Sequence, residues 1–193
     1  MSAVTFFKEF TRNWQHTGAV FPSSPALARA IVAAAEVAKA KHVLELGPGT
    51  GPFTDLISKS LAPDSRYLGV ELNPAFVAAL RKRFPHLDFA EAAAQEYDFT
   101  GWLPEDTGFD SVVSGLPWTA FPTGLQRAIL GHVLPRLAPG GKFATFAYTG
   151  LHLLPGGRSF RRLLAEQECR LTMTSTVWAN VPPAFIYVLT RHK

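Results

Sequence analysis

The feature that most constrains the fold is a glycine-rich segment directly after a short apolar run. Residues 43–51 read Val-Leu-Glu-Leu-Gly-Pro-Gly-Thr-Gly, and a second apolar run, residues 67–71, ends in Glu71. Glycine has no Cβ and tolerates unusual φ, so alternate glycines let the backbone approach a ligand closely. An acid at the end of the next strand can bind the two hydroxyls of a ribose. The two segments predict a nucleoside-containing cofactor across the first two strands of an α/β sheet.

The glycine spacing and the nearby charges indicate the class of cofactor. A dinucleotide fingerprint needs a third glycine where Pro52 stands, and no G-x-x-x-x-G-K-[ST] phosphate loop is present. No lysine or arginine lies between Lys41 and Lys59, and Glu45 at the strand tip repels anions. A tight strand-to-helix turn explains the glycines but neither acid. A cofactor with positive charge, a ribose and no phosphate fits, which predicts an enzyme using S-adenosyl-L-methionine and releasing S-adenosyl-L-homocysteine.

Length and composition predict one globular domain in a reducing compartment. The chain has 193 residues, is 47% hydrophobic and carries a single cysteine, Cys169, which excludes an internal disulfide. No Cys/His cluster has zinc-ligand spacing, so we expect no metal, and we expect neither a signal peptide nor a membrane-spanning helix. A net charge of +4 favours an anionic partner, either nucleic acid or an acidic membrane surface.

Strands and helices are expected to alternate beyond Glu71, which predicts a mostly parallel sheet with helices on both faces. Residues 170–178 and 184–191 are β-rich and joined only by residues 179–183, too short a link for a helical crossover, so they should pair antiparallel. The fold class is therefore α/β, with seven strands and an antiparallel last strand. The other expected strands are residues 87–90, 109–114 and 142–148, and the expected helices are residues 26–39, 74–83, 123–137 and 159–168.

The amino-terminal segment has the pattern of an amphipathic helix extension. In residues 3–16, large apolar side chains recur close to helical spacing, and basic residues lie on the other side. This pattern suits a helix in a membrane interface, while a core-packing helix or a lid over the cofactor explains it equally well. We therefore expect a helical lid or membrane-binding segment at residues 1–40 and a methyltransferase domain at residues 41–193. The expected membrane-contacting residues are Phe6, Phe7, Lys8, Phe10, Arg12 and Trp14.

Several motifs together resemble one enzyme family. The first is Trp14. The others are residues 18–29 (Gly-Ala-Val-x-Pro-Ser-Ser-x-x-Leu-Ala-Arg), 45–51, 71–74, 114–118 (Ser-Gly-Leu-Pro-Trp) and 180–184 (Asn-Val-Pro-Pro-Ala). The chain resembles, over nearly its whole length, the small soluble bacterial phospholipid N-methyltransferases, which have a Rossmann-like class I methyltransferase sheet. The resemblance implies a cytoplasmic enzyme that associates peripherally with the inner face of the cytoplasmic membrane. It also implies methylation of phosphatidylethanolamine toward phosphatidylcholine in up to three steps, with anionic lipids rather than nucleic acid as partners and a monomeric chain.

The same resemblance assigns the cofactor contacts. Glu45 is expected to orient the methionine part and Glu71 to hold the ribose. The loop at residues 91–95 lacks the usual acid for the adenine amino group at its usual place, so Gln95 or the Ala93 amide is expected to serve instead. The expected cofactor-binding residues are Glu45, Gly47, Pro48, Gly49, Gly51, Glu71, Leu72, Ala93, Gln95, Ser114 and Gly115.

Candidates for substrate contacts follow the fourth and fifth strands. A primary amine has a pKa of about 10, so it must lose a proton before it attacks a methyl group. Tyr148 and His152 are candidates to contact the amine or the lipid phosphate, and Trp118 and Tyr148 could hold methylammonium products by cation–π attraction. Strand-end packing for Tyr148 and a plain loop position for His152 remain alternatives. Arg158 and Arg161, with Arg162, are candidates to bind the lipid phosphate. The alternative is that these arginines only form a solvated face of a helix.

Two other functions compete with this interpretation. Ribosomal adenine N6-dimethyltransferases end the fourth strand in Asn-Leu-Pro-Tyr, where this chain has residues 115–118, Gly-Leu-Pro-Trp. The tryptophan could stack a flipped base, but glycine replaces the amide that would hold the target amine. A non-catalytic cofactor-binding subunit is the third possibility, and the presence of Glu45, Glu71 and all three glycines argues against it.

Overall fold

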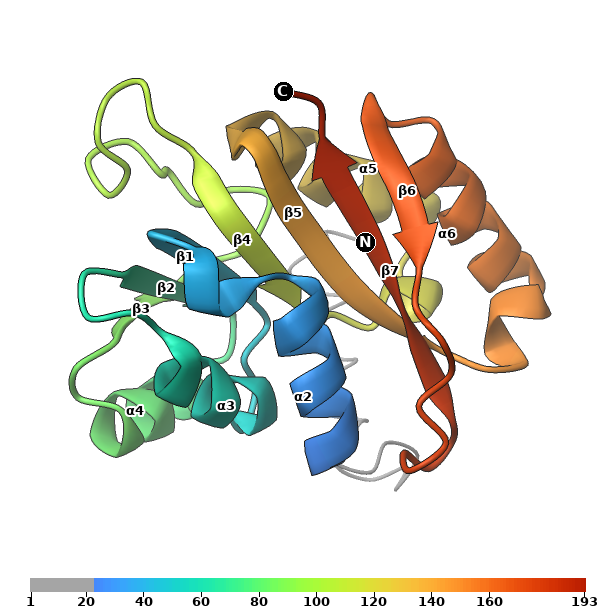
Figure 1. Ribbon diagram of the computed structural model, residues 1–193, viewed down its shortest axis with the longest axis horizontal. Helices are drawn as coiled ribbons and strands as arrows, with labels where there is room; N and C mark the ends of the chain where they lie inside the picture. The colour runs from blue at the N-terminus through green and yellow to red at the C-terminus, as the bar shows by residue number, and fades with distance from the viewer. Residues whose placement is uncertain (1–22) are drawn as a thin grey trace.

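The sheet of this protein has seven strands in the order β3-β2-β1-β4-β5-β7-β6, as the computed structural model shows for residues 23–193 (Figure 1). The predicted α/β class I methyltransferase architecture is confirmed. The helix expected at residues 3–16 and its membrane residues lie outside the described part. The helices are α2 (Pro25–Ala34), α3 (Pro52–Ser60), α4 (Pro74–Arg83), α5 (Thr123–Val133) and α6 (Pro155–Ala165), and the strands are β1 (His42–Leu46), β2 (Arg66–Glu71), β3 (Asp88–Glu91), β4 (Phe109–Ser114), β5 (Leu137–Tyr148), β6 (Cys169–Met173) and β7 (Ala184–Arg191).

Strands β1 to β5 are parallel, and β7 is antiparallel to both β5 and β6. The expected antiparallel pairing of the last two strands is confirmed. Because β5 and β6 both oppose β7, the carboxyl ends of β1 to β6 all lie at one edge of the sheet, which we call the carboxyl edge. The strand order reverses between β1 and β4, and ligands of such sheets bind in the crevice at this point.

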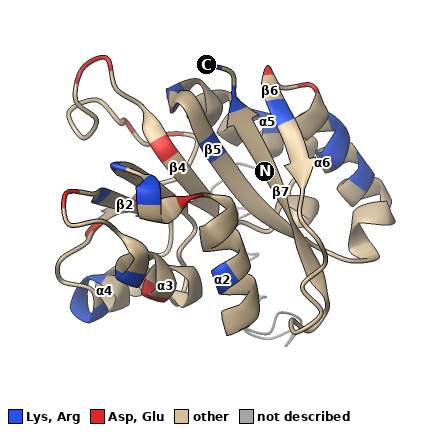
Figure 2. Ribbon diagram, in the orientation of Figure 1, with Lys and Arg blue, Asp and Glu red and all other residues tan. Residues whose placement is uncertain are grey.

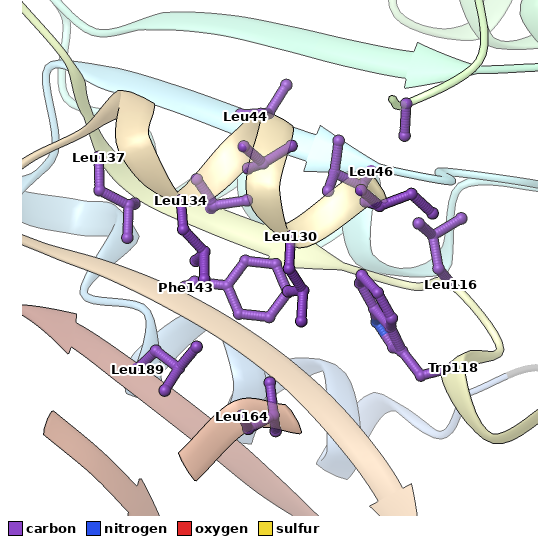
Figure 3. Close-up of a cluster of buried hydrophobic side chains, with 14 of the residues drawn as sticks. Leu44, Leu46, Leu116, Trp118, Leu130, Leu134, Leu137, Phe143, Leu164 and Leu189 are labelled. Carbon is purple, nitrogen blue, oxygen red and sulfur yellow. The ribbon is translucent and has the colours of Figure 1, made fainter. Parts of the chain in front are cut away.

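Helices cover both faces of the sheet (Figure 1). Alternate residues of a strand point to opposite faces, so Leu44 and Leu46 of β1 pack in a core with residues of α5 and α6. Figure 3 shows these two leucines beside Trp118 and Phe143. Val43 belongs to a second core, formed with α2, α3 and α4. Glu45 is on the same side of β1 as Val43 and is therefore directed toward the α2, α3 and α4 layer.

Helix starts follow the expected capping chemistry. The Ser24 side chain accepts a hydrogen bond from the Leu27 amide, and Pro25 is in the first helical turn. Asn73 accepts from the Ala75 amide in the same way at the start of α4. Among residues 23–193, no helix is long and apolar enough to cross a membrane.

Several boundaries differ from the sequence expectation. Helix α2 ends at Ala34 rather than residue 39, because Glu36 adopts a left-handed conformation with φ of 53°. Helix α6 begins at Pro155 rather than residue 159, and a Cβ at Gly156 would lie 2.8 Å from the Thr119 carbonyl oxygen. The pair of glycines thus allows close packing within a helix, although it resembles a loop in sequence. Strand β6 ends at Met173, five residues before the expected 178, which lengthens the connection to β7.

Candidate active site

The glycine loop after β1 has an unusual backbone at all three glycines. Gly47, Gly49 and Gly51 have φ of 67°, 59° and 86°, in the left-handed region that side chains disfavour. A Cβ at Gly47 would lie 2.6 Å from Leu116 Cδ2, whereas a Cβ at Gly49 would meet nothing within 4 Å. The loop therefore needs glycine for conformation at every position, and it leaves open space at Gly49 where a ligand can approach the backbone.

Glu71 at the end of β2 holds this loop in place. Its Oε2 accepts a hydrogen bond from the Gly49 amide at 3.0 Å, and its Oε1 accepts from the Asn73 amide at 2.8 Å. The residue is only 3% exposed, and burial raises the pKa of its carboxyl while the backbone amides oppose that shift. A carboxylate offers about four acceptor sites, so two amides leave capacity for the hydroxyls of a ribose. The expected ribose contact stays a prediction that this geometry allows.

Glu45 lies beneath the loop, in a different environment from Glu71. Its carboxylate is fully buried, and its Oε2 accepts hydrogen bonds from Thr54 Oγ1 at 2.8 Å and Tyr67 Oη at 2.6 Å. Its Oε1 has no hydrogen-bond partner within residues 23–193. Burial raises the pKa of Glu45 to about 7, against the lowering effect of the bonds from Tyr67 and Thr54. The structure thus connects Glu45 to α3 and β2, and its expected contact with the methionine part stays a prediction.

A pocket opens beside the glycine loop, between the ends of β1, β2 and β3 and the start of α5. Its lining is mostly apolar, as expected for a site that takes a flat purine base. Four residues expected from the sequence line it: Gly47, Leu72, Ala93 and Gln95. The other lining residues are Val70, Ala92, Ala94, Leu116, Phe121, Leu125 and Ile129.

The segment after β4 packs against the glycine loop. A Cβ at Gly115 would lie 2.8 Å from the Gly47 carbonyl oxygen, so this conformation has no room for a side chain there. Ser114 is fully buried, and its Oγ accepts a hydrogen bond from Trp118 Nε1 at 3.0 Å. Trp118 is only 2% exposed and stacks on Phe160 with ring centroids 5.0 Å apart. Cation–π binding by Trp118, as expected from the sequence, would require this stack to open.

Tyr148 and His152 lie at the carboxyl edge but do not line the pocket. Tyr148 is half-buried, contacts Phe146 edge-on, and has a phenol pKa raised by burial. His152 Nδ1 accepts a hydrogen bond from the Gly150 amide at 3.2 Å, and the ring contacts Phe185 edge-on. Because an amide can only donate, a neutral His152 ring carries its proton on Nε2. Their roles with the amine stay predictions.

Arg158, Arg161 and Arg162 are exposed on α6. Figure 2 shows the basic residues along this helix in blue. The amino end of α6 contacts the turn after β4 at Thr119, through Gly156. The arginines therefore follow the start of α6, which packs against the turn after β4, and their expected contact with a lipid phosphate stays a prediction.

Sequence reasoning missed two groups of site residues. Phe121, Leu125 and Ile129 line the pocket, and only the spacing of the last two along one helix face could have indicated it. Tyr67 was missed as a partner of Glu45. The signal was Gly69, which pairs with Glu45 across β1 and β2 and leaves room for the Tyr67 hydroxyl, since a Cβ there would lie 2.8 Å from Tyr67 Oη.

Comparison with known proteins identifies the kind of domain. A family model described as a methyltransferase domain matches residues 43–141. The ornithine lipid N-methyltransferase of Singulisphaera acidiphila is 37% identical over 142 residues, which are 72% of this chain and 73% of that protein. The probable ribosomal RNA small subunit methyltransferase A of Methanosarcina mazei is 37% identical over 92 residues, which are only 46% of this chain and 30% of that protein.

Solved structures with the same fold have low sequence identity. An O-methyltransferase from Bacillus cereus in complex with SAH has a TM-score of 0.71 at 14% identity, covering 99% of this chain and 92% of that one. The O-methyltransferase TomG from Streptomyces achromogenes, in complex with SAM, has a TM-score of 0.68 at 17% identity, covering 99% and 91%. At this identity the likeness establishes the fold alone.

Proposed function

The chain belongs to the class I S-adenosylmethionine-dependent methyltransferases, and we propose that it methylates the amine of a lipid headgroup, with phosphatidylethanolamine as the substrate. The product series leads through the mono- and dimethyl forms toward phosphatidylcholine. The enzyme acts at the inner surface of the cytoplasmic membrane. The observation that carries the proposal is the 37% identity to a lipid N-methyltransferase across most of both chains.

The described residues fit the cofactor. The open space at Gly49 and the free acceptor capacity of Glu71 suit a ribose and its neighbouring atoms. The apolar pocket with Gln95 and the Ala93 backbone suits the adenine base. No lysine or arginine lies between Lys41 and Lys59, in agreement with a cofactor that has no phosphate.

When bound, the cofactor supplies an electrophilic methyl group on a positively charged sulfur. The headgroup amine, once it has lost its proton, would use its lone pair to form the new bond to that methyl group, and the cofactor would leave as neutral S-adenosyl-L-homocysteine. The protein mainly has to align a neutral amine with that bond, so positioning supplies much of the rate. We propose that Tyr148 or His152 contacts the amine and directs its proton to water, and that Arg158 and Arg161 bind the lipid phosphate.

Ornithine lipid is the second candidate substrate. The relative with 37% identity carries that activity in its name, and an ornithine headgroup also offers a primary amine. Its headgroup contains a carboxylate instead of a phosphate, and guanidinium groups bind both anions. The two lipids therefore share the chemistry that the site would recognise.

Ribosomal RNA is disfavoured as a substrate by the turn after β4. The space around Gly115 is closed by the Gly47 carbonyl, so an amide side chain there requires the loops to separate. Trp118 is buried in the core instead of facing a base. Two of the RNA methyltransferase relatives match only 46% of this chain at 36–37% identity, and a third matches 80% of it but at only 27% identity.

The test is an acceptor comparison with methyl-labelled S-adenosylmethionine. The enzyme receives phosphatidylethanolamine vesicles, ornithine lipid vesicles or undermethylated ribosomal RNA in separate reactions. The proposal predicts label in phosphatidylethanolamine. Label only in ornithine lipid would reassign the substrate within lipid N-methylation, and label in RNA but not in lipid would overturn the proposal.

A further inference from the structure

The large apolar side chains that are exposed within residues 23–193 all lie in one part of the sequence. Trp178 is 75% exposed and Leu153 is 56% exposed, and no large hydrophobic residue outside residues 151–181 is exposed in the described chain. Soluble surfaces normally scatter such residues singly, so a group of them marks an interaction site. We call this group the apolar rim; its members are Leu151, Leu153, Leu154, Met173, Trp178 and Val181.

The topology brings the apolar rim to the carboxyl edge of the sheet. The leucines follow β5, in the turn η4 (Leu151–Leu153) and at Leu154, and Met173 ends β6. Trp178 and Val181 belong to the connection between β6 and β7, the red loop at the bottom of Figure 1. The Thr149 amide donates a hydrogen bond to the Pro183 carbonyl at 2.8 Å, which ties the two loops together.

This edge is also where the active site opens. The glycine loop and the pocket follow β1, β2 and β3 at the same edge. The amino end of α2 lies there too, because the Ser24 amide donates to Asn180 Oδ1 at 2.9 Å, two residues from Trp178. The aromatic and basic amino-terminal sequence therefore joins the described chain beside the apolar rim.

The charges near the apolar rim identify its occupant. Helix α6 begins directly after Leu154 and contains Arg158, Arg161 and Arg162 but no acid. Exposed leucines and a tryptophan next to arginines match a phospholipid interface, where aromatic rings lie at headgroup depth and guanidinium groups meet phosphates. A protein partner of neutral charge would not account for the row of arginines.

Building on the proposed function, we propose that the apolar rim inserts into the bilayer interface and holds the mouth of the active site against the membrane. This contact is separate from the amino-terminal segment and is made by loops that the fold itself positions. It gives the enzyme direct access to a headgroup amine that never leaves the bilayer.

The test removes the apolar rim while sparing the active site. One variant combines Leu153→Asp with Leu154→Asp, and aspartate at position 154 is also a favourable residue to precede α6. A second variant combines Trp178→Ser with Val181→Ser. Ala79→Asp, on the exposed side of α4, adds a charge without touching the apolar rim and is the matched control.

Binding is measured by sedimentation with vesicles of phosphatidylethanolamine and phosphatidylglycerol. Losing two apolar side chains from the bilayer interface should weaken partitioning at least about tenfold in both rim variants, and Ala79→Asp should bind as the wild type does. Activity on a short-chain phosphatidylethanolamine below its critical micelle concentration, cofactor affinity and the thermal midpoint should be unchanged in the rim variants. In a Trp14→Phe background, lipids brominated on the acyl chain should quench Trp178 fluorescence.

Rim variants that sediment like the wild type would overturn the proposal while leaving lipid methylation intact. Equal loss of activity on the short-chain lipid would assign the apolar rim to substrate binding instead. A change of oligomeric state on a sizing column, without a change in vesicle binding, would assign it to self-association. Failure of the proposed function has a different signature, because the wild type would then methylate neither vesicles nor the short-chain lipid.

Discussion

Glu71 contacts both the glycine loop and the start of α4, through the amides of Gly49 and Asn73. Replacing it with alanine removes a charged acceptor from both amides and from the predicted ribose site. Hydrogen bonds to charged groups contribute about 1.5–3 kcal/mol, so Glu71→Ala should weaken S-adenosylmethionine binding about 10- to 100-fold in calorimetry. Asp64→Ala, an exposed acid before β2, is the control, and an unchanged affinity of Glu71→Ala would remove Glu71 from the site.

Glu45 should make the stability of the cofactor-free protein depend on pH. Burial raises its pKa to about 7 in the folded state, above the value of about 4.3 in an unfolded chain. The folded state therefore binds the proton more tightly, and this stabilising effect is complete below the unfolded pKa and is lost as pH rises through the folded one. Between about pH 5 and pH 8, the contribution of Glu45 to the free energy of unfolding should fall by a few kcal/mol, as follows from the difference between its folded and unfolded pKa.

The measurement is the free energy of unfolding by denaturant at several pH values. Glu45→Gln retains the shape of the side chain without the titration, so its curve should be flatter than that of the wild type over this range. Parallel curves for the two proteins would show that Glu45 titrates normally.

At the scale of single elements, Asn180 connects the start of α2 to the β6–β7 connection. It is 3% exposed, accepts from the Ser24 amide at 2.9 Å and donates to the Pro182 carbonyl at 2.7 Å. Asn180→Ala leaves both backbone groups without this partner and should lower the free energy of unfolding by about 1–3 kcal/mol. Thr107→Ala, which removes an exposed bond to Pro104, should change it by less than about 0.5 kcal/mol. Equal effects of the two substitutions on the free energy of unfolding would contradict the stabilising role of Asn180.

The elements that sequence reasoning predicted well have strong local signals. Asn73-Pro74 specifies the start of α4, and the short link after residue 178 required an antiparallel last pair. The elements that it placed wrongly depend on tertiary contacts. Gly156 and Gly157 look like a loop in sequence, but they lie inside α6 because backbone from η4 and the turn after β4 packs where side chains would be.

The candidate site also has some features that the sequence could predict and others that it could not. The glycine spacing and Glu71 could be predicted because a short sequence encodes both their conformation and their chemistry. The burial of Trp118 against Phe160 could not, because these residues are distant in sequence and only the packed core joins them. Likewise Glu45 finds its partners Tyr67 and Thr54 on two other elements.

At the scale of the whole molecule, one edge of the sheet carries the cofactor pocket, the apolar rim, the start of α6 and the amino end of α2. The amino-terminal segment is expected to add a second membrane contact. Phe6→Asp combined with Phe10→Asp should therefore release part of the protein from phosphatidylethanolamine and phosphatidylglycerol vesicles in sedimentation, since each change places a charge in an apolar environment. Unchanged sedimentation of this variant would favour the core-packing or lid interpretation of the segment.

The central claim is methyl transfer to a lipid amine, and mass spectrometry of the lipid product tests it most directly. The wild-type enzyme is incubated with S-adenosylmethionine at a concentration near its Kd and with vesicles of phosphatidylethanolamine and phosphatidylglycerol, and Glu71→Ala is the control with weakened cofactor binding. The account predicts headgroups that carry added methyl groups on nitrogen with the wild type and far fewer with Glu71→Ala. Unmodified phosphatidylethanolamine after incubation with enzyme that binds both the cofactor and the vesicles would contradict it.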